Sequence, residues 1–297
     1  MCGIYGFTTG KKSNYAKKYQ LYKALAVATE IRGRHATGFA YSDGTHERYF
    51  KYGETASEFV MRPEFERIER DRPYMIIGHN RWATHGKPED NRNNHPFKSR
   101  TLQFIHNGVI SNYDSLRAEY PCYSECDSEV LLRIIERAPR RIAGIQSVYK
   151  EAEGNIACAM LDTRKLRMWL WRNYGNPIFL NYHTELDLLV FCSTRDIFET
   201  ACKESGLTEG WSCKGYYWND DNILCIRLVH GKIIRNTVEV EHKQVNPVSV
   251  RYWDTSRLTS YSKYYNSKGK RGSVRGGREV VRTSEVYWDN VNKCWGY

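Results

Sequence analysis

The chain has 297 residues, of which 41% are hydrophobic and 27% charged, a composition typical of an ordinary globular protein. No run approaches the roughly 18 consecutive apolar residues that a membrane span needs, and the N-terminus lacks the charged and apolar regions of a secretory signal. The nine cysteines are scattered, so we predict reduced thiols in a cytoplasmic protein, with no disulfide framework and no metal site.

The net charge of +11 is concentrated toward the C-terminus. Residues 245–297 contain ten Lys or Arg against four Asp or Glu. A polyanionic partner is one interpretation of this excess, and a contribution to solubility is another.

Short strands and helices alternate in the first half of the chain. Apolar runs predict strands, a periodic spacing over residues 15–31 predicts a helix, and Asp43-Gly44 indicates a hairpin. Residues 54–70 predict one or two short helices interrupted at Pro63. The polar residues 86–96 show neither the apolar period of a helix nor that of a strand, so they predict a long loop. Loops of this length usually serve binding. The predicted strands are residues 4–8, 38–42, 47–52, 74–79 and 102–106.

The second half begins with helices and continues with strands. Asp127 is placed to cap a helix through Val130 and Ile135, and a second helix is predicted over residues 140–152. One more helix near residues 196–204 interrupts a series of short strands. These strands are residues 156–162, 166–171, 178–181, 188–193, 223–228 and 232–235. The pattern predicts an α+β fold in which two antiparallel sheets pack together, with helices outside.

Two regions are predicted from composition. Residues 2–244 form the compact domain, and residues 245–297 form a basic extension rich in aromatic residues. Within the extension, residues 267–278 have the composition of a flexible linker, and the aromatic final segment is placed to dock back on the domain.

Cys2 is a candidate nucleophile because of its position. Removal of the initiator Met1 would leave a thiol and a free α-amine on one residue. An α-amine with a pKa of about 7.7–8.0 suits a general base near neutral pH, and a thiolate is a strong nucleophile. Taken alone, Cys2 is more often an incidental N-terminal residue, so its significance depends on the rest of the sequence.

Five further motifs follow Cys2-Gly3-Ile4-Tyr5-Gly6 in order. They are Arg32-Gly33-Arg34-His35-Ala36-Thr37-Gly38, Gly78-His79-Asn80-Arg81-Trp82-Ala83-Thr84-His85-Gly86, Asn94-His95-Pro96, His106-Asn107-Gly108-Val109-Ile110-Ser111-Asn112-Tyr113 and Cys126-Asp127-Ser128-Glu129. This series resembles the class II glutamine amidotransferase domain of the N-terminal-nucleophile hydrolase superfamily. It looks most similar to the glutaminase half of glucosamine-phosphate synthase and is also similar to glutamine phosphoribosylpyrophosphate amidotransferase. The resemblance implies a four-layer αββα sandwich.

The resemblance also implies roles for individual residues. Cys2 would attack the glutamine carboxamide and form a γ-glutamyl thioester, with Asn107 and Gly108 as the oxyanion hole. Arg81 would bind the substrate α-carboxylate, for which a planar guanidinium is well suited, and Asp127 would hold the α-ammonium group. Without the resemblance, Asn107-Gly108 is a turn dipeptide, Arg81 a surface ion-pair residue and Asp127 a helix cap.

Other matched positions surround these. Thr84 and His85 would assist at the carboxylate, and Arg32 and Gly33 would support the site. Trp82 is either an aromatic beside the glutamine pocket, followed by a mobile lid that runs through His95, or a core aromatic. Arg34 and His35 replace the residues usual in the synthase, and His35 is better interpreted as a surface histidine.

The expected function is that of a stand-alone glutaminase subunit. It would hydrolyse L-glutamine without a cofactor and supply ammonia to a separate synthetase or transferase, because the residues after 244 are too few and too basic for an acceptor domain. Two alternatives stay open. One is a nucleic-acid-binding module with a vestigial site, since aromatic and basic residues are interleaved in the extension. The other is an amidase for a different amide.

Overall fold

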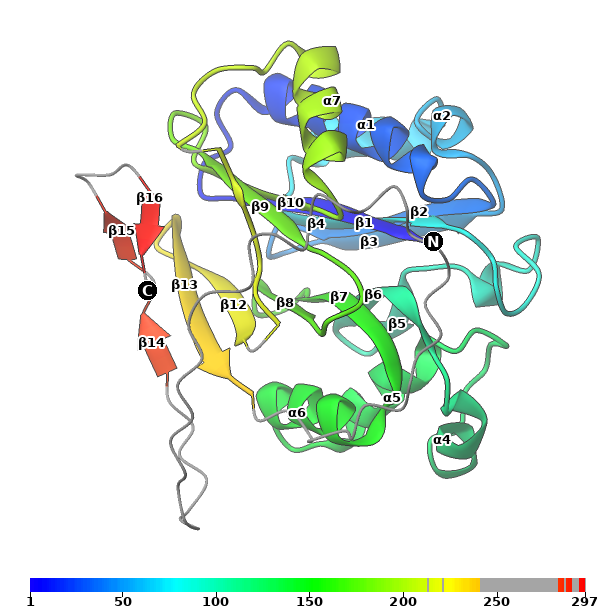
Figure 1. The fold of residues 1–297 in the computed structure, drawn as a ribbon. Helices are drawn as coiled ribbons and strands as arrows, with labels where there is room; N and C mark the ends of the chain where they lie inside the picture. The colour runs from blue at the N-terminus through cyan, green and yellow to red at the C-terminus, as the bar shows by residue number, and fades with distance from the viewer. Residues whose placement is uncertain (213, 221, 241–282, 286, 290–293, 297) are drawn as a thin grey trace, which may run out of the picture.

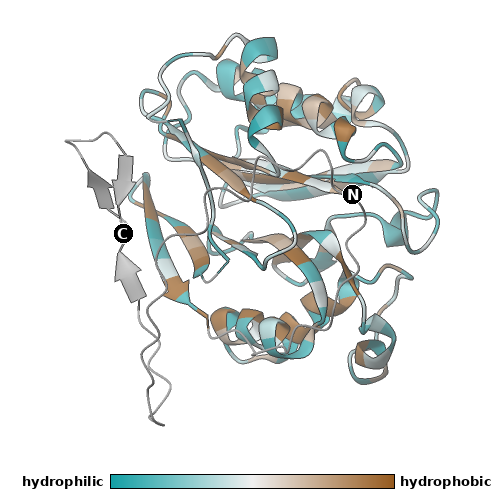
Figure 2. Ribbon diagram, in the orientation of Figure 1, coloured by the Kyte–Doolittle hydropathy of each residue, from teal (hydrophilic) through white to brown (hydrophobic). Residues whose placement is uncertain are grey.

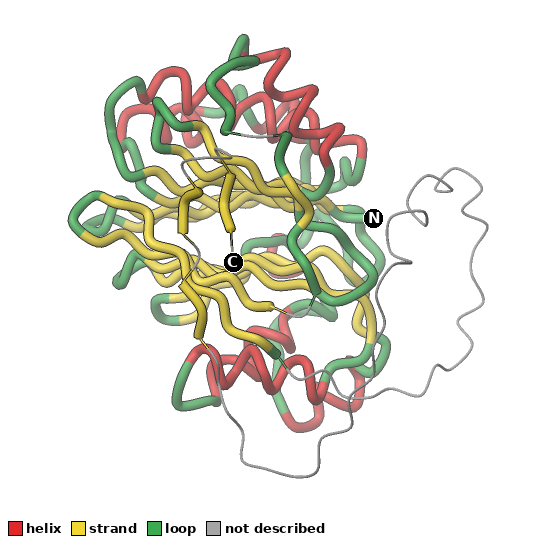
Figure 3. Tube along the Cα trace, turned by 60° about the vertical axis from the view of Figure 1, so that its left-hand side comes forward, coloured by secondary structure: helices red, strands yellow, loops and turns green. Residues whose placement is uncertain are grey.

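The structure is a computed structural model that describes residues 1–212, 214–220, 222–240, 283–285, 287–289 and 294–296. Two antiparallel seven-stranded sheets pack face to face, and helices cover the outer face of each sheet (Figure 1). Figure 3, turned by 60°, shows the two strand layers between two helical layers. The predicted α+β fold with four layers is therefore confirmed.

The first sheet contains the N-terminal strand near its centre. Its strand order is β11-β9-β10-β1-β4-β2-β3, and every neighbouring pair is antiparallel. The strands are β1 (Gly3–Thr9), β2 (Ala36–Ser42), β3 (Glu47–Tyr52), β4 (Met75–Arg81), β9 (Phe179–His183), β10 (Leu188–Cys192) and β11 (Tyr216–Tyr217). The helices over this sheet are α1 (Tyr15–Ala28), with a 3₁₀ turn at Thr29–Ile31, α2 (Ala56–Phe59), α3 (Pro63–Asp71) and α7 (Arg195–Ser205).

The second sheet has the order β14-β13-β12-β8-β7-β6-β5. Its strands are β5 (Phe97–Ser99), β6 (Leu102–Ile110), β7 (Gly154–Asp162), β8 (Arg167–Arg172), β12 (Asn222–Val229), β13 (Lys232–Glu239) and β14 (Thr283–Glu285). The helices on this side are α4 (Tyr113–Glu119), α5 (Glu129–Arg137) and α6 (Arg141–Glu151). A separate pair joins β15 (Tyr287–Asp289) to β16 (Cys294–Gly296).

Side chains point alternately to the two faces of each strand, and this alternation explains why the sheets pack in this way. In β1, Ile4 belongs to the apolar cluster between the sheets, whereas Tyr5 and Phe7 belong to the cluster under the helices. In β7, Ala157 and Leu161 face the space between the sheets in the same manner. Successive side chains of a strand point to opposite faces, so strands with apolar residues on both faces need cover on both. Figure 2 shows the hydrophobic residues that result along the strands and on α1 and α6.

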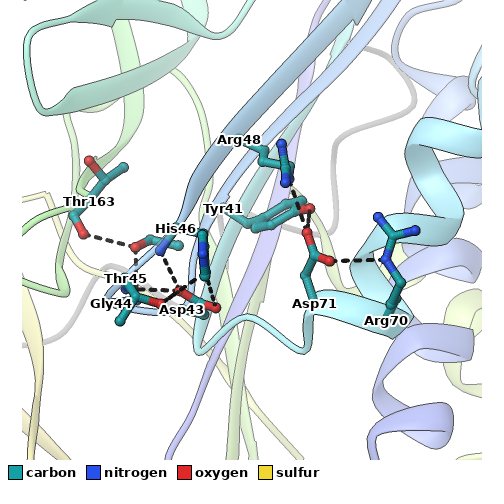
Figure 4. A network of polar contacts seen from close by, with 10 residues as sticks. Tyr41, Asp43, Gly44, Thr45, His46, Arg48, Arg70, Asp71 and Thr163 are labelled. Carbon is teal, nitrogen blue, oxygen red and sulfur yellow. Dashed lines mark hydrogen bonds and ion pairs between the residues drawn. The ribbon is translucent and has the colours of Figure 1, made fainter.

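The predicted hairpin around Asp43 is confirmed, and it is tied to α3. The Asp43 Oδ1 atom accepts hydrogen bonds from the backbone N–H groups of Thr45 at 2.8 Å and His46 at 2.6 Å, which close the turn (Figure 4). The Asp71 carboxylate at the end of α3 accepts from Tyr41 Oη at 2.7 Å and from Arg48 Nε at 3.1 Å. These contacts fix the outer strands of the first sheet against the helical layer.

Most predicted elements are present, with differences at their ends. Pro63 is the first residue of α3, where its fixed φ and missing N–H are tolerated. The strands β5, β11, β14, β15 and β16 and the helix α4 were not predicted. Seven of the cysteines are free thiols, namely Cys2, Cys122, Cys126, Cys158, Cys192, Cys202 and Cys225.

The extension is described only in part. The predicted boundary at residue 244 and the predicted linker at 267–278 lie outside the described residues. β14, from the extension, pairs with β13 and adds a strand to the edge of the second sheet. No helix in the described ranges combines the length and the apolar character needed to cross a bilayer.

Candidate active site

Strand register places Cys2 beside Arg81. Gly3 in β1 pairs with Asn80 in β4, so the residue before Gly3 lies next to the residue after Asn80. Ile4 and Ile77 both belong to the cluster between the sheets. Because Cys2 and Arg81 lie an even number of residues from these positions, their side chains are directed to the same inner face.

The alternation of side chains along β6 also directs Asn107 of the second sheet to the inner face, near Cys2 and Arg81. Ile105 of β6 faces the space between the sheets, so Asn107, two residues further on, does too. A hydrogen bond of 3.0 Å between His79 Nε2 and the His106 carbonyl oxygen joins the two sheets at this point. Its ends lie two residues from Arg81 and one residue from Asn107, so both sheets contribute to one site.

The Cys2 thiol contacts the backbone at the end of β4. Its Sγ lies 3.3 Å from Trp82 N and 3.5 Å from Trp82 O. Burial raises the pKa of the Cys2 thiol, and the Trp82 N–H and the charge of Arg81 oppose that increase. Burial also lowers the pKa of the Met1 α-amine. The surroundings therefore favour a neutral thiol and a neutral amine.

Arg32 and Gly33, predicted as supporting residues, contact the N-terminus and the end of β4. The Arg32 Nε atom donates a hydrogen bond of 2.7 Å to the Cys2 carbonyl oxygen. A Cβ atom on Gly33 would lie 2.5 Å from the Arg81 carbonyl carbon and 2.7 Å from Trp82 N. Only glycine permits this close approach to the end of β4.

The Asn107 side chain is buried without hydrogen-bond partners. Its exposed fraction is 1%, and within the described residues neither Oδ1 nor Nδ2 is paired. Its backbone carbonyl accepts a hydrogen bond of 2.9 Å from Asn176 Nδ2. An unpaired buried amide costs about 1–3 kcal/mol, which makes the Asn107 side chain a candidate functional group. Gly108 follows, and a Cβ there would lie 2.5 Å from His106 Nε2.

Arg81 holds both ends of the loop at residues 82–96. Its guanidinium donates to Asn94 Oδ1 at 2.9 Å, to the Gly86 carbonyl at 3.1 Å and to the His85 carbonyl. The side chain is only 2% exposed. A guanidinium has five N–H donors, so these three bonds leave capacity for a ligand.

Asp127 does not cap α5, and the prediction that it does is wrong. Ser128 occupies the N-cap position, and no side chain there accepts a capping hydrogen bond. The Asp127 Oδ2 atom instead accepts a hydrogen bond of 2.7 Å from Ile110 N at the end of β6. The Oδ1 atom lies 3.9 Å from His85 Nδ1. The Ile110 N–H therefore binds one oxygen of the Asp127 carboxylate and holds this side chain at the end of β6.

Trp82 and Thr84 lie on the surface. Trp82 is 49% exposed, so its interpretation as a core aromatic is wrong. Its ring packs on His35 with 4.7 Å between the ring centroids, and His35 Nδ1 accepts a hydrogen bond of 2.9 Å from Ala83 N. His35 is an exposed histidine, as predicted, whose contact fixes the start of the loop. His85, by contrast, packs on the Tyr113 ring at 4.8 Å.

Three buried histidines behind the site received no role from the sequence. His79 and His95 stack with 3.9 Å between centroids, and His106 is hydrogen-bonded to Ser128 Oγ at 2.8 Å. Burial lowers the pKa of His79 to about 3 and lowers those of His95 and His106 as well. The signal that was overlooked is their position inside the motifs, each within two residues of Arg81, Asn94 or Asn107.

A cleft of about 460 Å³ opens beside the N-terminus. Met1, Arg32 and Trp82 form one side, and Thr194 and Ile197 from the start of α7 form the other. Arg81, Asn107 and Asp127 are not among the residues that line it. In the described ranges no group of three or more His, Cys, Asp or Glu side chains is placed to hold a metal ion.

Comparisons with known proteins found similarity to glutamine-dependent transferases. Residues 79–200 match a family described as "Glutamine amidotransferase domain". The glutamine–fructose-6-phosphate aminotransferase (isomerizing) of Sulfurisphaera tokodaii is 29% identical over 190 residues, which are 61% of this chain and 31% of that protein. The enzyme of the same name from Staphylococcus epidermidis is 31% identical over 172 residues, 54% of this chain and 27% of the relative. The chain thus spans less than a third of the length of these curated relatives.

Solved structures share the fold. Glutamine phosphoribosylpyrophosphate amidotransferase from B. subtilis superimposes with a TM-score of 0.58 at 20% identity, over 76% of this chain and 47% of that one. A structure described as the allosteric regulatory enzyme of purine biosynthesis gives a TM-score of 0.59 at 20% identity, with the same coverage. The chain therefore shares its fold with these amidotransferase structures, and residues 79–200 match a glutamine amidotransferase domain.

Proposed function

We propose that this chain hydrolyses the side-chain amide of L-glutamine through a thioester on Cys2 and supplies the ammonia to a separate acceptor enzyme. The observation that carries the proposal is the unpaired, buried amide of Asn107 at the end of the sandwich where Cys2 and Arg81 also lie. A hydrogen-bond donor that is held in place and unused in the free protein is what a developing oxyanion requires.

The proposed reaction begins with removal of Met1, which gives Cys2 a free α-amine. The amine accepts the thiol proton while Sγ attacks the carboxamide carbon. Asn107 Nδ2 and the Gly108 N–H stabilise the tetrahedral oxyanion. Its collapse breaks the C–N bond, the protonated amine gives its proton to the departing ammonia, and water then hydrolyses the thioester to glutamate. Burial raises the pKa of the Cys2 thiol, so the thiol is protonated before the attack and its proton is available to the amine.

Substrate binding is assigned to the charged pair around the loop. Arg81 would hold the α-carboxylate with the donors that the loop does not use, assisted by Thr84 and His85, and Asp127 would hold the α-ammonium group. Arg81 and Asp127 are both about 2% exposed, so neither is an ordinary surface ion-pair residue. Trp82 and the following loop would close over the bound glutamine.

Delivery of ammonia to another polypeptide is supported by the surface near Cys2. Ile31 and Trp82 are 85% and 49% exposed, and both line the cleft beside the N-terminus. Exposed apolar side chains gathered at one place are typical of protein interaction sites. We therefore assign docking of the acceptor to this surface.

A glutaminase assay with protein variants tests the hydrolytic proposal. The purified chain should release glutamate and ammonia from glutamine and should be labelled on Cys2 by an electrophilic glutamine analogue. Cys2→Ala should be inactive, whereas Cys225→Ala, which removes a partly buried thiol in the second sheet, should keep full activity. Mass spectrometry should show that active protein lacks Met1. Full activity with Met1 retained would contradict the role of the amine.

Two further measurements separate the alternatives. Hydrolysis of asparagine or N-acyl amides at the rate of glutamine would favour an amidase of other specificity. Inactivity together with salt-dependent binding of nucleic acid, lost when residues 245–297 are removed, would favour the binding module.

A further inference from the structure

A second cleft, with a volume of about 740 Å³, lies on the second sheet far from the candidate active site. It is formed by the start of α6, the turn between β7 and β8, and residues of β8, β12 and β13. In β7, Ala157 pairs with Asn107, whereas Asp162 lines the cleft. Five residues of strand separate these positions by about 16 Å, so the cleft is distinct from the glutamine site.

The cleft is strongly basic. Five of its lining residues are cations, and one is an anion. The cations are Arg140, Arg141, Arg164, Lys165 and Arg167. Among the described residues none of the five forms an ion pair within 4.0 Å. Positive charges held together without partners repel one another, so a bound anion would stabilise them.

The acidic residues nearby are already engaged. The Asp162 Oδ1 atom accepts hydrogen bonds from the backbone N–H groups of Arg164 at 3.2 Å and Lys165 at 3.1 Å, which hold the turn. Glu47 lies near Arg164 but is paired with Lys98 at 2.8 Å. Both carboxylates therefore already have partners, and the cleft lining keeps an excess of positive charge.

The first turn of α6 adds to this charge. The helix has 11 residues and begins at Arg141, with no side-chain cap and no acidic residue in its first turn. Ile142 and Ala143 of that turn line the cleft. Uncapped N–H groups at a helix N-terminus carry partial positive charge and bind phosphate well.

Trp169 supplies an independent indication of a ligand. It forms part of the cleft wall and is only 3% exposed, yet its Nε1–H has no hydrogen-bond partner in the described part of the chain. Buried indole N–H groups normally find an acceptor. The flat ring and the unused donor make Trp169 a candidate contact for a ligand in the cleft.

We propose that this cleft binds a small phosphorylated molecule. The phosphate lies at the start of α6 among Arg140, Arg141 and Arg164, and the less polar part lies against Trp169 and Val238. The volume is within the range of about 300–1,000 Å³ usual for small-molecule sites. This inference goes beyond the proposed glutaminase function and does not depend on it.

Ligand binding to the full chain tests the proposal, with pyrophosphate and ADP as the probes. Both should raise the Tm of the protein, and ADP should bind at least tenfold more tightly, because its base and ribose reach the Trp169 wall. The double variant Arg141→Ala/Arg164→Ala should weaken both at least tenfold, whereas Arg67→Ala, on α3 in the other helical layer, should change neither. Trp169→Phe should weaken ADP several-fold.

The same measurements can overturn it. Absence of binding by either probe at millimolar concentration, or equal losses in the double variant and in Arg67→Ala, would reject the site. Binding of a ribo-oligonucleotide without binding of either small probe would reject the small-molecule assignment. An unchanged ADP affinity in Trp169→Phe would reject the role of the indole. Because binding is read without glutamine and can be repeated in Cys2→Ala, its failure is distinguishable from failure of the glutaminase proposal.

Discussion

The Asn107 amide combines complete burial with an absence of partners, and this leads to the first prediction. Asn107→Ala should lower kcat for glutamine hydrolysis by about 10²–10³ and leave KM nearly unchanged, because the lost hydrogen bond forms only in the transition state. Steady-state kinetics measures both constants. Gln103 is a matched control, since it lies four residues away on the same face of β6 and its buried amide is also unpaired. If Gln103→Leu lowers kcat equally, the effect of Asn107 is one of stability.

Some site residues could be predicted from the sequence, and others could not. The motifs identified Cys2, Arg81 and Asn107, which the structure brings to one end of the sandwich. Local capping propensity failed for Asp127, because the competing donor, Ile110 N, is 17 positions away in the chain. Capping propensity depends on residues that are neighbours in the sequence. The hydrogen bond that a carboxylate forms depends on the donors that lie near it in the folded chain.

Among the elements, the loop at residues 82–96 depends most on one buried side chain. Asn94 is 0% exposed, accepts a hydrogen bond from Arg81, and donates to Pro88 O at 2.6 Å and to Asn91 Oδ1 at 3.0 Å. Asn94→Ala should therefore increase amide hydrogen exchange in the loop about tenfold or more and raise KM for glutamine. Exchange mass spectrometry measures the first effect and steady-state kinetics the second.

Asp90→Ala is the matched control for this loop. Among the described residues the Asp90 side chain accepts only from the guanidinium and backbone N–H of Arg92, so its loss should affect the 3₁₀ turn Asn91–Asn93 and leave the exchange of the other loop amides nearly unchanged. Equal exchange in the two variants would mean that Asn94 does not anchor the loop.

The elements that escaped prediction are short or lack periodicity. β5 has three residues, and its strand character comes from pairing with β6. α4 has a single buried residue, Leu116, so no apolar stripe marks it. Long periodic segments such as α1 were predictable because burial of one face requires the pattern.

For the whole molecule, the buried histidines determine stability in mild acid. His79 has a pKa of about 3 when folded against about 6.5 when unfolded, so between pH 6.5 and pH 3 the unfolded state binds more protons and stability falls as pH falls. At pH 5 this costs about 2 kcal/mol for His79 alone. His95 and His106 act in the same direction.

Urea unfolding at pH 7 and pH 5 measures this loss of stability. His95→Phe should reduce the difference between the two pH values, because both ring nitrogens of His95 are buried without partners in the described structure. His46→Gln, at an exposed turn, should not change it. A pH dependence unaffected by His95→Phe would exclude the buried ring as a cause.

The four-layer arrangement was predictable as a class, whereas its registers were not. Alternating apolar residues require two buried sheet faces, but many pairings satisfy that pattern. The pairing of Gly3 with Asn80, and the bond between His79 and the His106 carbonyl, fix the one arrangement that assembles the site. Such contacts link residues too far apart in the chain for local patterns to specify.

The central place of β1 bears on how the protein should be produced. Its partners, β10 and β4, hold Gly3–Thr9 from both sides, so an affinity tag added upstream leaves the sheet intact. The same tag converts the terminal amine into an amide and crowds the space beside Trp82. Under the proposed mechanism such a fusion would fold but would not hydrolyse glutamine. A tag should therefore be placed at the C-terminus, or be removed by a protease that leaves Cys2 as the first residue.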